Sequence, residues 1–333
     1  MLENRELAAH EQAMEILNNL AASLNIVTIS RVKGIIDEEL LKQALGMIQS
    51  RHPLLNSRIV AKKNSFYFEA GADKIPLSVV KNQQIEEWEE VVIKELNQKI
   101  KSDENLLRVT LVNFEEEENI CYLITTIHHA IADASSCIQL HSEILANCQK
   151  IIEGKVQTNV NQLAQLPSID KLIPKSFHGV TGKIANALYL LRLKLQLKRY
   201  KPTTLNFEKT APLEFCSCGM VHRKLESKLV KRLVEVCRQR KTTVQAALGA
   251  AMLFAVAEKN NNQGENHYFS FRSSINLRQR LQPQISSDNL GAIASAVLSF
   301  HNFQVNDNFW DLARDIKLKL EKGLANGEAF RQI

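Results

Sequence analysis

Glycine, proline and cysteine are scarce in this chain of 333 residues, which has only 12 Gly, 7 Pro and 6 Cys. With 45% hydrophobic and 23% charged residues, this composition excludes a collagen-like, low-complexity or disordered chain. No apolar run approaches the roughly 20 residues that a transmembrane helix needs. Charged residues near the N-terminus also interrupt the apolar stretch that a signal peptide requires. We therefore expect a globular, cytoplasmic protein without a membrane span.

The six cysteines are irregularly spaced, which excludes a disulfide framework and indicates reduced thiols. Cys216 and Cys218 lie two positions apart, but they lack the second pair of ligands that a zinc site requires. The chain also lacks the glycine-rich phosphate-binding patterns G-x-G-x-x-G and G-x-x-x-x-G-K-[ST]. We therefore expect neither a metal site nor a cofactor-binding site.

Positive charge is concentrated in one segment. The formal net charge is +6, from 42 basic and 36 acidic residues. Residues 171–201 contain eight Lys or Arg and no Asp or Glu, so the rest of the chain sums to −2. A nucleic-acid-binding protein usually builds its basic face from several elements, so we expect no nucleic acid as partner. The segment is either a site for a local anionic partner or a solvated linker.

A length of 333 residues exceeds what one hydrophobic core typically supports, so we expect two domains or two fused halves. Helical and extended patterns alternate through the first half. Helical spacing is found at 6–17 (apolar positions 7, 13, 14 and 17), at 38–50 behind an Asp37 cap, at 86–100, and after Ser135 or Ser136. Strands are predicted at 25–33, 55–61, 65–69, 106–114 and 119–127, with the glutamates 115–118 in a solvated turn.

The second half has the same mixed character. Helices are predicted at 226–240, 243–259 and 309–323, and strands at 268–275 and within 288–300. The helix at 243–259 is almost entirely apolar, so we expect it to be central. Residues 184–197 fit an amphipathic helix, although part of them also alternates with period two. We predict a mixed α/β fold with an N-terminal half at 1–150, a basic connecting segment at 151–210 and a C-terminal half at 211–333.

Two adjacent histidines, His128 and His129, follow the predicted strand 119–127, and Asp133 comes shortly after them. That strand is nearly continuous in apolar and β-branched residues, which is typical of a strand buried on both faces. Imidazole is the usual general base at neutral pH, and a loop at the end of a buried strand holds it rigidly. The alternative is that both histidines only terminate the strand, with their nitrogens bonded to the backbone.

The sequence 126–136 resembles the His-His-x-x-x-Asp-Gly signature of the condensation-domain superfamily. This superfamily includes nonribosomal peptide synthetase condensation domains, alcohol acyltransferases and polyketide-associated acyltransferases, all related in fold to chloramphenicol acetyltransferase. Three further segments resemble the family in the same order along the chain: the Arg-His-x-x-Leu segment 51–58, the Asn-Leu-Arg-x-Arg segment 274–283, and the glycine-containing segment 289–291. Four ordered matches are much harder to obtain by chance than one.

The resemblance implies a role for each residue of the signature. His129 is the implied catalytic histidine, whereas His128 and Asp133 are structural, with Asp133 paired to Arg278 across the two halves. Such a pair, when buried, fixes the geometry of a loop more than it adds stability, because desolvation offsets much of the attraction. The implied fold is a V-shaped pseudo-dimer of two chloramphenicol acetyltransferase-like halves, with a central tunnel and His129 near its middle.

The reaction that the resemblance implies is acyl transfer. His129 would remove a proton from a small-molecule alcohol or amine as that acceptor attacks an acyl thioester. The donor would be acyl-CoA or an acyl carrier protein, both of which present the acyl group on a phosphopantetheine arm. The basic segment 171–201 would then meet the phosphate of that arm or an acidic carrier surface.

Two features depart from the family pattern. Ala134 stands where the signature has glycine, which matters only if that position requires a positive φ. Family members also continue well past the helix predicted at 309–323, so we expect a shortened, incomplete second half. These departures leave a second function open, namely a non-catalytic module that binds a carrier protein or a partner subunit.

Overall fold

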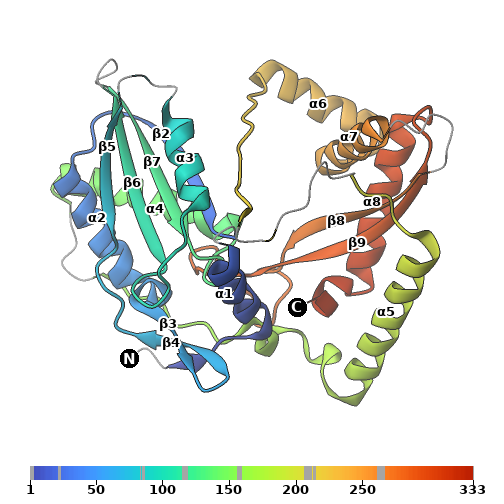
Figure 1. The fold of residues 1–333 in the computed structure, drawn as a ribbon, viewed down its shortest axis with the longest axis horizontal. Coiled ribbons are helices and arrows are strands. Elements are labelled where there is room, and N and C mark those ends of the chain that lie inside the picture. Colours follow the sequence, from blue (N-terminus) through green and yellow to red (C-terminus); the bar gives the residue numbers. More distant parts are fainter. Residues whose placement is uncertain are drawn as a thin grey trace. The chain divides into compact units, whose positions relative to one another are not determined.

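The computed structural model describes residues 4–21, 24–82, 84, 87–114, 119–155, 160–205, 212, 215–260 and 267–332. The chain forms two compact units (Figure 1). Unit 1 comprises residues 1–172, 211–220 and 278–293, and unit 2 comprises residues 173–210, 221–277 and 294–333. The predicted turn at 115–118 lies outside the described residues.

Unit 1 is built on a four-stranded sheet of order β2-β7-β6-β5, in which β7 is an inner strand. β7 pairs antiparallel with β2 and β6, whereas β5 pairs parallel with β6. The predicted strands 25–33, 106–114 and 119–127 are present, and β5 is a strand that we did not predict. The bounds are β2 (Ile26–Lys33), β5 (Leu77–Asn82), β6 (Leu107–Phe114) and β7 (Ile120–Ile127).

Side chains from both faces of β7 are buried, as predicted for a strand with a continuous apolar sequence. Leu123 and Ile127 point into the larger core, whereas Tyr122 and Ile124 lie in a second cluster on the other face. This division follows the period-two alternation of side chains along a strand. In the second cluster, Trp88 stacks on Tyr122 with ring centroids 5.4 Å apart.

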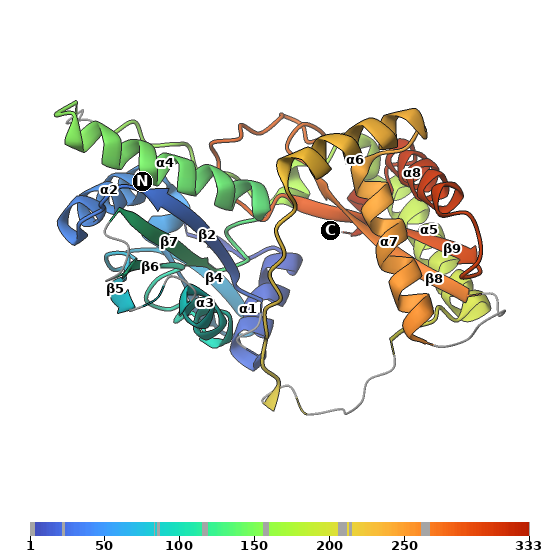
Figure 2. The same cartoon turned by 90° about the horizontal axis from the view of Figure 1, so that it is seen from above.

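The helices of unit 1 lie on both sides of this sheet (Figure 2). α2 and α4 pack together over the larger core, and α3 packs against β2 and β7. The Asp37 side chain caps α2 as predicted, accepting a hydrogen bond from Leu40 N at 2.7 Å. The bounds are α1 (Ala9–Ala21), α2 (Glu38–Arg51), η1 (Pro53–Asn56), α3 (Trp88–Asn97), α4 (Ala134–Ile152) and η3 (Ile169–Leu172).

A second, three-stranded sheet of order β1-β4-β3 completes unit 1. Its β3–β4 hairpin is the one predicted at 55–69, and it turns through Lys63, which has a φ of 53°. The bounds are β1 (Arg5–Glu6), β3 (Ser57–Lys62) and β4 (Ser65–Ala70).

The buried face of α1 differs from the prediction. The predicted apolar face comprised positions 7, 13, 14 and 17. Leu7 is buried and Met14 packs partly buried against the larger core, but the buried residues within the helix are Glu11, Glu15 and Asn18. These polar side chains are four and three positions apart, so they share one helix face. Each has a polar partner in unit 1: Glu11 binds Arg5, Glu15 lies beside His128, and Asn18 bonds to the Ile100 backbone. Satisfied hydrogen bonds allow this polar face to be buried.

One buried histidine gives unit 1 a predicted acid sensitivity. His141 on α4 is bonded through its two ring nitrogens to Ser30 Oγ and Thr125 Oγ1, both at 2.7 Å. Burial lowers the pKa of His141 from 6.5 to about 4. The unfolded chain therefore binds this proton more readily than the folded one, so stability present above pH 6.5 is lost as the pH falls through about 4.

The expected loss of unfolding free energy from His141 is about 3 kcal/mol across that range. Urea denaturation of the wild type and of His141→Gln at pH 7 and pH 4 measures it. The glutamine variant should lose less stability on acidification than the wild type. An equal loss in both proteins would show that His141 does not cause the sensitivity.

Unit 2 contains one antiparallel strand pair, β8 and β9, together with helices. Its core packs α7 and α8 against these strands, through residues such as Leu253, Phe269, Phe303 and Ile316. The bounds are η4 (Lys175–Phe177), α5 (Gly179–Tyr200), α6 (Ser227–Gln239), α7 (Val244–Lys259), β8 (His267–Asn276), β9 (Ala294–Phe303), α8 (Phe309–Ala325) and η6 (Glu328–Gln332).

The helices α5 and α7 of unit 2 each test a prediction from the sequence. Residues 184–197 lie inside the helix α5, so the helical interpretation is right and the period-two alternative is wrong. α7 is buried only along one side, through residues such as Ala246, Ala250 and Ala257. Leu248 and Met252 are 49% and 64% exposed, so α7 is not buried all round as its composition predicted.

The division into units differs from the predicted boundaries at 150 and 210. The predicted connecting segment is shared, because η3 lies in unit 1 and α5 in unit 2. The segment 278–293, which joins β8 to β9, lies in unit 1. It packs there through Leu290, which is part of the larger core. Hydrophobic spacing does not predict that the segment 278–293 belongs to unit 1. Such spacing indicates local helix or strand structure, not which residues a loop packs against.

None of the helices in the described ranges is long and apolar enough to cross a membrane.

Candidate active site

The two adjacent histidines lie where β7 ends and α4 is about to begin. Backbone hydrogen bonds hold this junction: His128 N donates to Leu106 O at 2.9 Å, and Ile131 N donates to His128 O at 3.1 Å. Ala130, Ile131 and Ala132 are all buried. The loop is therefore a rigid part of unit 1, as a loop that presents a reactive side chain needs to be.

His128 is fully buried and its ring is fixed from both sides. Its Nδ1 accepts a hydrogen bond from Ala130 N at 3.1 Å, which in a neutral imidazole leaves the ring proton on Nε2. Nε2 lies 3.0 Å from Glu15 Oε2, a close contact that departs from ideal hydrogen-bond geometry. These contacts agree with a structural role for His128.

Glu15 is a residue of this region that the sequence did not reveal. It is 3% exposed, and its Oε1 accepts hydrogen bonds from Ser102 Oγ at 2.8 Å and Asn19 Nδ2 at 2.7 Å. Burial alone would raise the pKa of Glu15, but the close contact with the His128 ring and the hydrogen bond from Ser102 outweigh it and lower the pKa. Glu15 is therefore the anion that faces the His128 ring.

Replacing Glu15 tests this arrangement. Glu15→Ala leaves the His128 ring N–H and the Ser102 hydroxyl without their acceptor, and we expect it to lower the free energy of unfolding by about 2–3 kcal/mol. Glu15→Gln retains an acceptor oxygen and should lose less. Urea denaturation at pH 7 measures both. Wild-type stability in the alanine variant would contradict the proposed support of His128.

His129 differs from its neighbour. Its side chain is half-buried. Its Nδ1 is buried and has no hydrogen-bond partner among the described residues. A buried nitrogen without a hydrogen-bond partner carries a desolvation cost, and a catalytic role is one explanation for such a group in a native protein. Of the two histidines, His129 has the less buried side chain.

Asp133 is buried and organises the start of α4. Its Oδ1 caps the helix by accepting a hydrogen bond from Ser136 N at 2.8 Å. Its Oδ2 accepts from Arg278 Nη1 at 2.7 Å and from Ile293 N at 3.2 Å. Asp133 therefore joins the loop that carries His129 to the segment 278–293.

Arg278 lies at the centre of this junction. It is 3% exposed, and its Nη2 donates to Ser136 Oγ at 2.8 Å and to Asn289 O at 3.3 Å. The expected contact between Asp133 and Arg278 is present. It lies within unit 1 rather than between two separate halves, because the segment that carries Arg278 packs in unit 1.

Ala134 is the first residue of α4 and is exposed. It is not among the residues with positive φ in the described part of the chain. Alanine therefore fits this position without backbone strain, since only a positive φ would favour glycine here. The departure from the family signature therefore imposes no strain on the backbone at this position.

The segment that begins at Arg51 is also part of unit 1's polar framework. Glu143 on α4 binds Arg51 Nε at 2.7 Å and His52 Nε2 at 2.8 Å, one through each carboxylate oxygen. Arg51 Nη2 also contacts Asp288 Oδ2 at 3.0 Å. These contacts tie α2, α4 and the segment 278–293 together, which gives the Arg-His pair a structural role.

No three His, Cys, Asp or Glu side chains in the described ranges are grouped so that they could hold a metal ion. Cys216 is exposed and Cys218 is half-buried, and neither forms a disulfide within the described residues. A histidine imidazole such as that of His129 can take part in proton transfer.

Two family models match the chain, one in each half. The model of the Condensation domain matches residues 12–162, and the model of the phthiocerol/phthiodiolone dimycocerosyl transferase C-terminus matches residues 217–333. The resemblance to the condensation-domain superfamily is confirmed. Acyl and condensation transfer is the typical activity of these families, which supports a general acyl-transfer role.

Solved structures of the superfamily share the fold. The first condensation domain of the calcium-dependent antibiotic synthetase is similar with a TM-score of 0.75 at 11% identity, over 98% of this chain and 75% of that one. Polyketide synthase associated protein 5 from Mycobacterium tuberculosis is similar with a TM-score of 0.66 at 16% identity, over the same shares of the two chains. These likenesses confirm the predicted mixed α/β fold of the chloramphenicol acetyltransferase kind. The predicted tunnel stays a prediction.

A third solved structure contains a ligand. A variant of the starter condensation domain of rhizomide synthetase, in complex with C8-CoA, is similar with a TM-score of 0.69 at 12% identity. It is matched over 98% of this chain and 74% of its own.

Proposed function

We propose that the protein is an acyltransferase that moves an acyl group from a CoA or acyl-carrier-protein thioester to a hydroxyl or amine acceptor, with His129 as general base. The observation that carries the proposal is the contrast between the two adjacent histidines. His128 is fully buried and its Nδ1 accepts a hydrogen bond from Ala130 N, whereas the His129 side chain is half-buried and its Nδ1 has no hydrogen-bond partner among the described residues.

The reaction follows from a neutral imidazole next to an acceptor. His129 takes the proton of the acceptor's hydroxyl or amine while the acceptor's oxygen or nitrogen attacks the thioester carbonyl carbon. The tetrahedral intermediate then collapses, the carbon–sulfur bond breaks, and the thiolate leaves. The thiolate recovers the proton from His129, so the products are an ester or amide and a free thiol.

The surroundings of His129 support this role by holding its backbone still. The start of α4 is fixed by Asp133 and Ser136, which follow His129 by four and seven positions. Arg278, from the segment 278–293, binds both of these side chains. Glu15 and the Ala130 backbone hold the neighbouring His128 ring. A base that is held in place before the substrate binds gains from orientation.

The choice of a CoA or phosphopantetheine thioester as donor is supported by a relative. A variant of the starter condensation domain of rhizomide synthetase is known in complex with C8-CoA. We extend that donor class to this chain as part of the proposal.

The proposal is tested by measuring thiol release from a panel of acyl-CoA and acyl-phosphopantetheine donors, each with and without a mixture of alcohols and amines. We expect release that requires the acceptor. A folded protein that releases no thiol with any pair of donor and acceptor would contradict the proposal and favour a module that only binds a carrier protein or partner subunit.

A further inference from the structure

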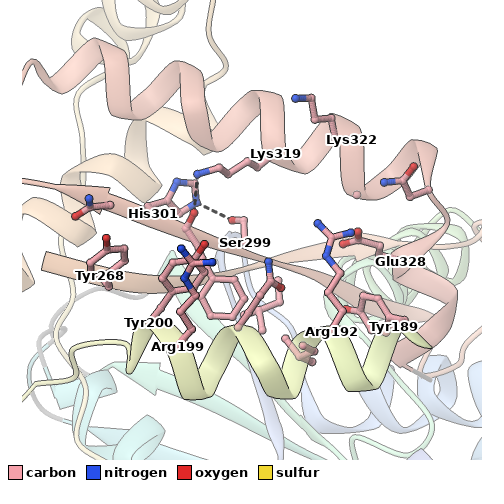
Figure 3. A pocket seen from close by; sticks show the side chains of 17 residues that line it. Tyr189, Arg192, Arg199, Tyr200, Tyr268, Ser299, His301, Lys319, Lys322 and Glu328 are labelled. Carbon is pink, nitrogen blue, oxygen red and sulfur yellow. Dashed lines mark hydrogen bonds between the residues drawn. The ribbon is translucent and has the colours of Figure 1, made fainter. Parts of the chain in front are cut away.

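Unit 2 contains a cavity of about 540 Å³ that has no part in the proposed reaction. It lies between α5, β9 and α8, and Figure 3 shows the side chains that surround it. This volume is within the range of small-molecule pockets, about 300–1,000 Å³. The cavity includes part of the basic segment 171–201, for which the sequence predicted either an anionic partner or a solvated linker.

Positive side chains line this cavity from two elements. Arg192 and Arg199 come from α5, two turns apart on one side of the helix, and Lys319 and Lys322 come from α8. One carboxylate, that of Glu328, is among the lining residues. Arg192, Arg199 and Lys322 form no ion pair within the described part of the chain. Arg199 lies over the Tyr200 ring, with its guanidinium carbon 5.6 Å from the ring centroid, and this contact leaves its charge available to an anion.

Lys319 is held by a chain of polar groups, of which His301 and Ser299 are buried. Its Nζ donates to Phe300 O at 2.6 Å and to Asp315 Oδ2 at 2.7 Å. Asp315 Oδ2 also lies 2.7 Å from His301 Nδ1, whose ring in turn contacts Ser299 Oγ at 2.7 Å through Nε2. Burial would raise the pKa of Asp315, but the hydrogen bonds from His301 and Lys319 outweigh it and lower the pKa. Lys319 and Asp315 thus neutralise each other.

The net charge facing the cavity is therefore set by the remaining groups. The three cations Arg192, Arg199 and Lys322 exceed the single anion Glu328 by two charges. Guanidinium groups donate in a planar fork that fits two phosphate oxygens at once. The two arginines make phosphate a better match than a single carboxylate.

Aromatic rings form another part of the wall. Tyr200 stacks on Tyr268 with ring centroids 5.1 Å apart, and it lies 5.8 Å from the Phe300 ring. Tyr189 lines the same cavity. Such rings favour contact with another flat ring, through offset stacking or an edge-to-face arrangement. A ligand that suits this cavity combines a flat ring with phosphate.

We propose that this cavity binds a phosphorylated nucleotide. Its phosphates are held by Arg192 and Arg199, and its base packs against the tyrosine rings. The proposal concerns unit 2 alone and does not rest on the acyl transfer proposed for His129.

Isothermal titration calorimetry with ADP, adenosine and inorganic pyrophosphate tests the ligand class. ADP should bind at least about tenfold more tightly than adenosine, because adenosine lacks the charge-assisted hydrogen bonds to arginine. It should also bind more tightly than pyrophosphate, which lacks the base. Equal binding of ADP and pyrophosphate would overturn the assignment to a nucleotide, and absence of ADP binding would overturn the site altogether.

A matched pair of double variants tests the location. Arg192→Ala with Arg199→Ala removes two charges that line the cavity, whereas Lys194→Ala with Lys198→Ala removes two exposed charges from the same helix that do not line it. The arginine variant should bind ADP at least about tenfold more weakly, and the lysine variant about as well as the wild type. Equal weakening in both would show nonspecific attraction to α5 and would overturn the proposal.

Circular dichroism of both variants establishes that α5 and unit 2 are still folded. His129→Ala serves as a further control, since it should bind ADP as the wild type does. Loss of acyl transfer with retained ADP binding would contradict the proposed function only. Retained transfer with no ADP binding would contradict the nucleotide site only.

Discussion

His129→Ala is expected to lower acceptor-dependent thiol release by about 100-fold or more, because general base catalysis typically contributes 100-fold to 10,000-fold. The fold should be unaffected, since the His129 side chain is only half-buried and its Nδ1 has no hydrogen-bond partner among the described residues. The measurement is kcat/KM for thiol release, with the acceptor varied at saturating donor.

Two controls accompany the His129 variant. His222→Ala removes an exposed histidine and should retain wild-type kcat/KM. Thermal unfolding followed by circular dichroism should give the same Tm for His129→Ala and the wild type. A His129→Ala protein with wild-type activity would contradict its role as the base, whatever its Tm.

Arg278→Ala is expected to lower the free energy of unfolding of unit 1 by about 3–5 kcal/mol, because it leaves the buried Asp133 carboxylate without its charged partner. Asp133 and Arg278 are each 3% exposed, and their closest oxygen and nitrogen are 2.7 Å apart. The variant also removes a donor from Ser136 Oγ. A loss of this size is a large part of a typical domain's stability.

The two tryptophans of the chain allow unit 1 to be measured separately. Trp88 lies in unit 1 and Trp310 in unit 2, so urea denaturation in a Trp310→Phe background reports unit 1 through Trp88 fluorescence. Arg278→Lys retains the charge and should lose less stability than Arg278→Ala. The exposed ion pair of Lys42 and Glu38 provides a control, and Lys42→Ala should leave stability nearly unchanged. An Arg278→Ala protein as stable as the wild type would contradict the role of the buried pair.

The strands and helices near the site could be predicted because their patterns are local. β7 has an apolar sequence that fits burial on both faces, and the structure places its side chains in two clusters. Asp37 caps α2 through a contact three residues away along the chain. The placement of the histidine pair between β7 and α4 follows from the same local signals.

Glu15 could not be predicted, because its role depends on contacts that are distant in sequence. A glutamate between apolar positions of a helix is normally on the solvent side. Here Glu15 is buried because His128 and Ser102 supply its hydrogen-bonding partners, 113 and 87 positions away. The polar face of α1 therefore becomes recognisable only once β7 and the loop around Ser102 are in place.

The contact between Asp133 and Arg278 was expected from the family resemblance, but its setting was not. The segment 278–293 follows β8 of unit 2 in the chain. It nevertheless belongs to unit 1, because it contacts Ser136 and because Leu290 is part of the larger core. Sequence order placed it in the C-terminal half. The physical reason for the difference is that long-range packing, which a periodic pattern does not encode, decides where a loop belongs.

The most direct test of the proposed acyl transfer is mass spectrometry of the acceptor after reaction with an acyl-CoA or acyl-phosphopantetheine donor, with free thiol measured in the same sample. The proposal predicts one acylated acceptor for each thiol released by the wild type, and almost none of either with His129→Ala. Thiol release without acylated acceptor, or equal product from both proteins, would contradict acyl transfer by His129.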